Sequence, residues 1–282
     1  MKIFNSAAEL RMELDSRRHE NSSIGLVPTM GNLHQGHLRL VDEAVSTCDY
    51  VVSTIFVNPL QFGPQEDLQS YPRTFEQDQI KLTEAGCHCL YAPSVEEVFG
   101  KELKSQTQLH IPGLSEKLCG KSRPGHFDGV ATVVCKLFNS VNPNIAFFGL
   151  KDYQQFLIIQ KMTSDLGFDI NLVGVEIVRD KTGLALSSRN NYLSEDELIK
   201  AKTLYSCLTE AATRIEGGEK DFALLEQQAL ASIEAAGLTP DYFSIAHAQT
   251  LDSAQSIDRE LALLAAAYLG STRLIDNIRI QL

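Results

Sequence analysis

The chain has 282 residues, 44% of them hydrophobic and 22% charged, which is near the average for globular proteins and argues against disorder and fibrous repeats. Its 25 basic and 36 acidic side chains give a formal net charge of −11 at pH 7, and such a surface repels nucleic acid and anionic lipid as default partners. The longest apolar run, Leu261 to Leu269, is far shorter than the about 20 residues that a membrane-spanning helix needs.

The first part of the chain alternates β-rich runs with helical patterns, which predicts a Rossmann-like, doubly wound parallel sheet of the α/β class. The expected strands are short apolar runs rich in β-branched residues, and the expected helices carry apolar residues at helical spacing. The strands are predicted at residues 24–27, 50–57, 145–148 and 172–178, and the helices at residues 37–48, 74–85 and 153–166.

The pattern changes at the polar turn from Arg179 to Gly183. Beyond it the sequence predicts two helices, the first opened by a capping box at Ser194 to Glu197, and then three β-like runs. These runs are residues 242–248, 261–269 and 274–280. We therefore expect two domains: a Rossmann-like domain over residues 1–183 and a smaller α+β domain over residues 184–282.

The six cysteines show no paired CxxC spacing, which is typical of reduced thiols in a cytoplasmic protein. The amino-terminal segment Met1–Ser6 turns polar too early for the core of a signal peptide, which favours the same location. The segment Cys87–Cys89, with His88 between its thiols, lacks the second ligand pair of a zinc site. We therefore expect no metal held by protein ligands alone.

The strongest local signal runs from Pro28 to His37, where the first of these strands leads into a helix. Ligands of open α/β sheets bind at this edge, and the N–H groups at a helix start favour an anion. His34 and His37 lie on one helix face around Gly36, where two imidazoles can donate hydrogen bonds to a phosphate chain. The alternative is an ordinary turn with two solvated histidines. Neither a GxGxxG motif after a strand nor a complete P-loop is present in the sequence.

A second strand-to-helix junction, Phe148 to Gln155, places Lys151 to meet a phosphate and Asp152 to meet a ribose hydroxyl. Asp152 and Gln155 are equally compatible with a capping box. Gln61 follows the second of these strands, where a buried amide needs a partner, either a polar ligand or the backbone.

Two further segments carry weaker signals. The segment Leu186–Asn190 contains Arg189, a residue suited to pair with phosphate oxygens, among ordinary turn formers. The segment Arg123–Gly129 is predicted to be a glycine-rich loop with arginine and histidine, for which a structural role is as reasonable as binding.

Five segments in this order closely resemble the pantoate–β-alanine ligase (pantothenate synthetase) family, which belongs to the nucleotidyltransferases with a HIGH-type signature. They are PTMGNLHQGHLRL, IFVNPLQFGPQEDLQSYPRT, RPGHFDGV, FFGLKDYQQ and LALSSRNNYL, and the signature is His34–His37. The resemblance implies that ATP and (R)-pantoate form an enzyme-bound pantoyl adenylate and pyrophosphate, and that β-alanine then gives pantothenate and AMP. It also implies a cytoplasmic, Mg²⁺-dependent homodimer with small-molecule substrates.

The resemblance also implies roles for individual residues. The implied catalytic residues are His37, as proton donor, together with His34 and Lys151. Gln61 and Gln155 would hold pantoate, and Gln61 would also lie near the β-alanine position. Arg123 and His126 would form a mobile wall of the site. The implied ATP contacts are Met30, Gly31, Asn32, Leu33, His34, Gln35, Gly36, His37, Gly149, Leu150, Lys151, Asp152, Val178 (through its backbone), Leu186, Ser187, Ser188 and Arg189, of which the last four form a KMSKS-like loop.

At two positions the sequence departs from the family pattern: Leu150 stands where glutamate is common and Leu186 where methionine is common, so we expect backbone or apolar contacts there. Two alternative functions stay open. One is another HIGH-type adenylate-forming enzyme, although the net charge of −11 disfavours tRNA as its partner. The other is a nucleotide-binding module without catalysis, which the complete set of His34, His37, Lys151 and Arg189 disfavours.

Overall fold

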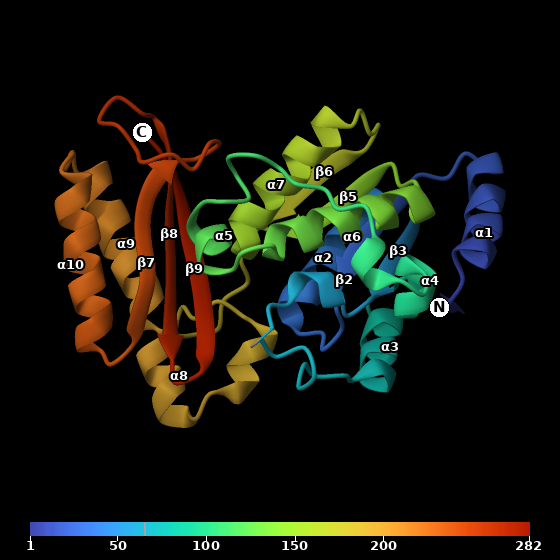
Figure 1. Ribbon diagram of the computed structural model, residues 1–282, viewed down its shortest axis with the longest axis horizontal. Coiled ribbons are helices and arrows are strands. Elements are labelled where there is room, and N and C mark those ends of the chain that lie inside the picture. Colours follow the sequence, from blue (N-terminus) through green and yellow to red (C-terminus); the bar gives the residue numbers. More distant parts are fainter. Residues whose placement is uncertain (65) are drawn as a thin grey trace. The chain divides into compact units, whose positions relative to one another are not determined.

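The computed structural model describes residues 1–64 and 66–282, which form two compact units (Figure 1). The first unit comprises Met1–Glu116, Arg123–Leu150 and Gln155–Glu176. The second comprises Lys117–Ser122, Lys151–Gln154 and Ile177–Leu282. None of the described helices is long and apolar enough to cross a membrane.

The first unit is built on a six-stranded parallel sheet, which confirms the predicted fold class. Its strand order is β1-β4-β3-β2-β5-β6. The order in which strands are added reverses between β2 and β5, because β3 and β4 lie on one side of β2, and β5 and β6 on the other. Open α/β sheets bind ligands at such a switch point. The strands are β1 Lys2–Phe4, β2 Ile24–Thr29, β3 Tyr50–Ile55, β4 Cys89–Tyr91, β5 Ile145–Gly149 and β6 Asn171–Val175.

Helices cover this sheet, and its inner strands β2, β3, β4 and β5 are mostly apolar and largely buried. Leu40, Val41 and Ala44 of α2 pack with Val27 of β2 and Phe147 of β5 in one core cluster. The helices of the first unit are α1 Ala7–His19, α2 Gln35–Thr47, α3 Phe75–Glu84, α4 Val95–Phe99, α6 His126–Val141 and α7 Tyr153–Asp165, with short 3₁₀ helices η1 Pro59–Gln61, η2 Leu103–Ser105 and η3 Leu150–Asp152. The residues of η3 and of the first turn of α7 are divided between the two units.

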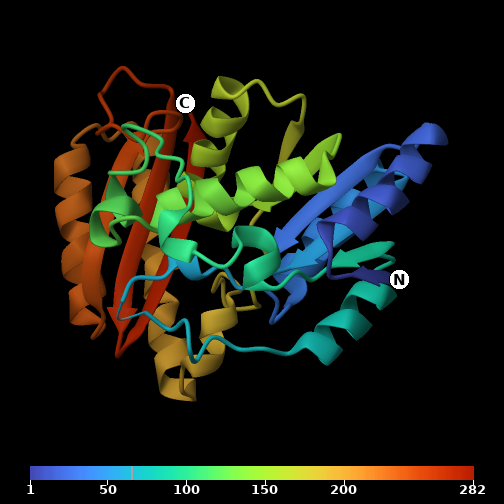
Figure 2. The same ribbon diagram turned by 45° about the vertical axis from the view of Figure 1, so that its right-hand side comes forward.

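The second unit contains an antiparallel sheet in the order β7-β8-β9, flanked by α9 and α10 (Figures 1 and 2). The predicted capping box is present at the start of α8, where the Ser194 side chain accepts from the Glu197 N–H. The strands are β7 Thr239–His247, β8 Glu260–Leu269 and β9 Thr272–Gln281; the helices are α5 Leu118–Ser122, α8 Glu195–Ala201, α9 Thr203–Glu216, α10 Phe222–Ala235 and the 3₁₀ helix η4 Ser188–Tyr192.

The structure corrects several local predictions. Three α-helices, not two, lie between residue 183 and β7, because α8 and α9 are separated only by Lys202, which the sequence pattern does not mark. The segment predicted as a glycine-rich loop at Arg123–Gly129 is helical from His126 onward. The strand predicted to reach residue 178 ends at Val175. Asp152 is the last residue of η3, which runs directly into α7, so it stands at the position that the capping box with Gln155 requires, and that box stays a prediction.

The predicted division into domains 1–183 and 184–282 stays a prediction, because compactness alone does not show which part of the chain folds by itself. The second unit starts at Ile177 and also takes in the segments Lys117–Ser122 and Lys151–Gln154.

Candidate active site

The junction between β2 and α2 is held in place by helix α3. The Asp78 carboxylate, fully buried, accepts from the Asn32 N–H and the Leu33 N–H, both at 2.8 Å. Lys81 Nζ, one turn further along α3, donates to the Leu33 carbonyl at 2.6 Å. Gly31 has φ +81, and a Cβ there would come within 3.1 Å of Asp78 Oδ2, so the turn requires glycine. Asp78 and Lys81 were missed by sequence analysis, since they look like ordinary polar residues of a surface helix.

His34 and His37 form a capping box at the start of α2. His34 Nδ1 accepts from the Gly36 N–H at 3.1 Å, His37 Nδ1 accepts from the His34 N–H at 3.3 Å, and the two ring centroids are 4.1 Å apart. A neutral imidazole that accepts at Nδ1 carries its proton on Nε2. Both rings are therefore oriented as Nε2–H donors beside a helix N-terminus, which suits binding of an anion.

Gln61 is held by Asn58, a buried residue that sequence analysis did not single out. Asn58 Nδ2 donates to Gln61 Oε1 at 3.0 Å and to the Gly129 carbonyl at 3.1 Å, and Asn58 Oδ1 accepts from the Leu60 N–H at 3.2 Å. The amide orientation of Gln61 follows from these contacts, because its oxygen accepts and its Nε2 therefore donates. That nitrogen lies 3.0 Å from Met30 Sδ, so the structure brings Gln61 to the end of β2.

Arg123 and His126 lie against the same 3₁₀ turn. His126 Nδ1 is 2.7 Å from the Gln61 carbonyl and His126 Nε2 is 3.0 Å from Arg123 Nη1. Since a carbonyl only accepts and a guanidinium only donates, the His126 proton is on Nδ1. Arg123 also forms an ion pair with Glu66, with Nε and Nη2 at 2.7 and 2.6 Å from the carboxylate oxygens. Burial raises the pKa of Glu66, but the hydrogen bonds and charge of Arg123 outweigh it and lower the pKa overall.

The strand β5 is followed by the 3₁₀ helix η3, which contains Leu150, Lys151 and Asp152. Leu150 is buried, and its side chain packs over Gly174 of β6 so closely that a Cβ there would lie 2.5 Å from Leu150 Cδ2. Leu150 is therefore a core residue that packs on β6. Lys151 follows, with its carbonyl accepting from Asn277 Nδ2 at 2.9 Å, while Asp152 is exposed and Gln155 half-buried.

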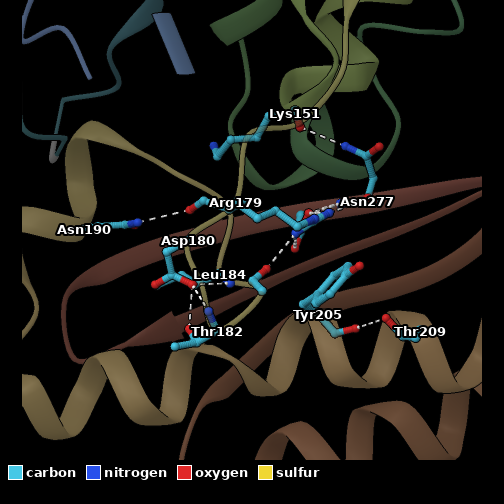
Figure 3. A network of polar contacts seen from close by, with 12 residues as sticks. Lys151, Arg179, Asp180, Thr182, Leu184, Asn190, Tyr205, Thr209 and Asn277 are labelled. Carbon is cyan, nitrogen blue, oxygen red and sulfur yellow. Dashed lines mark hydrogen bonds and ion pairs between the residues drawn. The ribbon is translucent and has the colours of Figure 1, made fainter. Parts of the chain in front are cut away.

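The segment predicted as a KMSKS-like loop leaves a short β-hairpin in the second unit (Figure 3). The Leu186 N–H donates to the Val178 carbonyl at 2.9 Å. The Ser187 side chain then caps η4 by accepting from the Arg189 N–H at 3.3 Å, and Asn190 Nδ2 donates to the Ala185 carbonyl at 3.0 Å. These bonds give the segment a defined path through residues 186–190.

The predicted site residues are thus distributed over both units. In the first unit the structure brings Met30 and Gln61 together with Arg123 and His126, and pairs His34 with His37. Gly149, Leu150 and Gln155 also belong to the first unit, whereas Lys151, Asp152, Val178 and residues 186–189 belong to the second. Among the described residues, no group of three or more His, Cys, Asp or Glu side chains is arranged to hold a metal ion.

A family model described as pantoate-beta-alanine ligase matches residues 2–279. The chain belongs to the pantoate–β-alanine ligase family. It is 52% identical to a pantothenate synthetase from Pseudomonas fluorescens and 51% identical to one from Pseudomonas aeruginosa, over 282 residues in each case; the alignments cover all of this chain and 99% and 100% of these relatives.

Solved structures of the ligase family share the fold. A pantothenate synthetase from Thermus thermophilus superimposes with a TM-score of 0.92 at 41% identity, covering 99% of both chains. A pantoate-beta-alanine ligase from Francisella tularensis, solved as a complex with "Beta-gamma ATP and Beta-alanine", gives a TM-score of 0.81 at 32% identity, covering 99% of this chain and 97% of that one.

Proposed function

We propose that this chain condenses (R)-pantoate with β-alanine at the expense of ATP, giving pantothenate, AMP and pyrophosphate through an enzyme-bound pantoyl adenylate. The observation that carries the proposal is membership of the ligase family over residues 2–279. The Francisella relative, whose structure contains an ATP compound and β-alanine, supports the substrate assignment.

In the first step a pantoate carboxylate oxygen attacks the α-phosphorus of ATP, and the bond to the bridging oxygen of pyrophosphate breaks. The substrate is its own nucleophile, so the protein needs no covalent serine or cysteine; its tasks are to align the reactants and to stabilise charge on the leaving group. We assign this stabilisation to the Nε2–H groups of His34 and His37, with His37 as the proton donor, because their Nδ1 atoms are engaged in the helix cap.

The remaining contacts are proposed by position. Lys151 and the Leu186–Arg189 loop would bind the triphosphate, the Val178 backbone the adenine, and Met30–His37 together with Gly149–Asp152 the rest of ATP. Gln61 and Gln155 would hold pantoate, because the amide of Gln61 is preoriented by Asn58 to present Nε2 as a donor to a carboxylate or hydroxyl. Arg123 and His126 would hold Gln61 in place through hydrogen bonds to its backbone carbonyl.

In the second step the β-alanine amine attacks the acyl carbon of the adenylate and AMP leaves. Water competes for the same carbon, so the adenylate must be kept from solvent until the amine arrives. We assign that protection to the Leu186–Arg189 loop.

Mg²⁺ would supply charge neutralisation on the ATP phosphates. Mg²⁺ usually keeps several waters and binds through substrate phosphates plus one or two carboxylates. This mode of binding does not require a cluster of three or more protein ligands, and the described residues contain no such cluster. Following the resemblance, we also propose that the protein is a cytoplasmic homodimer.

The test is exchange of labelled pyrophosphate into ATP with pantoate present and β-alanine left out. Exchange that depends on pantoate is the expected result and would establish the first half-reaction. Exchange with a different carboxylic acid but not with pantoate would keep the chemistry and refute the substrate. Absence of exchange with every acid, in protein that binds ATP, would refute catalysis and favour the nucleotide-binding module.

A further inference from the structure

A buried polar pair lies in the last strand of the second unit. Asp276 and Asn277 of β9 are only 5% and 3% exposed, in a strand whose other buried side chains are mostly apolar. The Asp276 carboxylate accepts from the backbone N–H of Asn277 at 2.8 Å, which orients the Asp276 side chain. Buried polar groups are costly unless they are hydrogen-bonded, and both of these make contacts outside the strand.

Asp276 binds Arg179, at the base of the hairpin that precedes the Leu186–Arg189 loop. Arg179 Nη1 and Nη2 lie 2.6 and 2.9 Å from the two carboxylate oxygens, a bidentate geometry. The same guanidinium donates to the Gly183 carbonyl at 3.0 Å and lies 3.8 Å from the centre of the Tyr205 ring. Arg179 is therefore held on several sides and has little freedom to move.

The hairpin itself is tied together by hydrogen bonds. The Asp180 N–H donates to the Leu184 carbonyl at 2.9 Å, and Asp180 Oδ1 accepts from the Thr182 N–H at 2.7 Å and the Leu184 N–H at 3.1 Å (Figure 3). Gly183 has φ +90, and a Cβ there would lie 2.5 Å from the Tyr205 ring. Since these bonds tie the two arms of the hairpin together, the position of Arg179 helps to set where the chain enters the loop at Leu186.

Asn277 binds the other proposed phosphate-binding segment. Its Nδ2 donates to the Lys151 carbonyl at 2.9 Å, and Figure 3 shows the Lys151 side chain extending away from that bond. The bond therefore constrains the backbone from which the ammonium group projects and leaves the ammonium group available.

We propose that Asp276 and Asn277 are positioning residues for the reaction of ATP. Through Arg179 and through the Lys151 carbonyl, two adjacent residues of one strand set the relative placement of the Lys151 backbone and the Leu186–Arg189 loop. All these residues belong to the second unit. The proposal rests on the proposed function, because it takes Lys151 and Arg189 as the groups that bind the triphosphate.

Stability alone explains this arrangement poorly. A buried ion pair is often no more stabilising than apolar side chains of the same volume, and β9 packs in an otherwise apolar core. A fixed spacing between two anion-binding segments does need directional bonds. Misplacement by about 1 Å can cost a reaction about 100-fold, so small errors at the base of the hairpin matter.

The experiment compares Asp276→Asn and Asn277→Leu with Asp241→Asn as the matched control. Asp241 forms a partly buried ion pair in the same sheet, in which Arg273 Nε and Nη2 lie 3.0 and 2.6 Å from its Oδ2 atom. Its other oxygen accepts from Ser122 Oγ at 2.7 Å, away from the hairpin and from Lys151. For each variant we would measure the melting temperature, pyrophosphate exchange against ATP and pantoate concentration, and ATP affinity by calorimetry.

We expect Asp276→Asn and Asn277→Leu to raise the KM for ATP about tenfold and to slow exchange about 10- to 100-fold, with the KM for pantoate within twofold of wild type. Asp241→Asn should melt earlier yet keep its KM for ATP. Should Asp276→Asn fail to fold, Asn277→Leu, which removes the bond to the Lys151 carbonyl and keeps the ion pair of Asp276 with Arg179, carries the test.

Equal losses in the control and in both β9 variants, or an unchanged KM for ATP in folded Asn277→Leu, would overturn the proposal and leave a merely structural role. Failure of the proposed function is distinguishable, since wild-type protein would then show no pantoate-dependent exchange. In that case ATP affinity decides: a tenfold loss confined to the β9 variants supports positioning, and no loss refutes it.

Discussion

Gly129, in the first turns of α6, packs against the 3₁₀ turn that carries Gln61, and its replacement by alanine is a sharp test of the site. A Cβ at this position would lie 2.3 Å from the Leu60 carbonyl oxygen and 2.7 Å from the Gln61 nitrogen. Both neighbours are backbone and cannot rotate away. Restoring an ordinary 3.4 Å contact requires 3.4 − 2.3, or about 1.1 Å, of movement between α6 and residues 59–61.

That movement would displace Gln61 and weaken the bond from Asn58 Nδ2 to the Gly129 carbonyl, which is 3.1 Å long. Helix propensity alone would make Gly129→Ala more stable by about 1 kcal/mol. Overpacking costs about 1–3 kcal/mol, so we expect a net loss of stability. Because a misplacement of about 1 Å can cost about 100-fold, we expect kcat/KM for pantoate to fall by about that factor while the KM for ATP changes little.

The assay is pantoate-dependent pyrophosphate exchange, together with denaturant unfolding of the same preparations. Gly63→Ala is the matched control: it lies two residues after Gln61, and its new methyl group would meet the Glu66 side chain at 3.6 Å, an ordinary contact. The reasoning is wrong if Gly129→Ala is more stable than wild type and uses pantoate as well as Gly63→Ala does.

Three other outcomes are expected. His37→Ala should lower the rate of exchange about 100- to 1,000-fold, as loss of one preorganised donor does, and a rate within threefold of wild type would remove His37 from the mechanism. Arg123 holds the pKa of Glu66 below its usual 4.5, so this pair stabilises the fold above pH 4.5, and the contribution is lost as the pH falls through the lowered pKa. In Glu66→Gln the free energy of unfolding should therefore fall less steeply as the pH is lowered. The same steepness in this variant as in wild type would contradict the assignment. Burial raises the pKa of Cys87 to about 11, so at pH 8 iodoacetamide should label this thiol only after unfolding, as peptide mass spectrometry would show; rapid labelling of the native protein would refute its burial.

The features that sequence alone determined are local ones. The alternation of buried strands and helices predicted the parallel sheet, because strands covered on both faces are continuously apolar. His34, Gly36 and His37 stood out at the start of α2 because strand-to-helix junctions at this sheet edge bind ligands. Ser194 and Glu197 marked the start of α8, since a capping box needs only two residues three positions apart. In each case the physical cause lies within one turn or one strand.

The supports of the site were decided by tertiary structure. Asp78 holds the turn before α2 from 46 residues away, and Asn277 holds the Lys151 carbonyl from 126 residues away. An aspartate or asparagine looks the same in sequence whether its side chain is solvated or buried against a distant backbone. Gly129 was noticed as part of a motif, but its partner, the Leu60 carbonyl, became known only when α6 packed on η1. Such bonds form because packing brings remote segments into contact and leaves their polar groups no water to bind, and neither condition leaves a periodic trace in the chain.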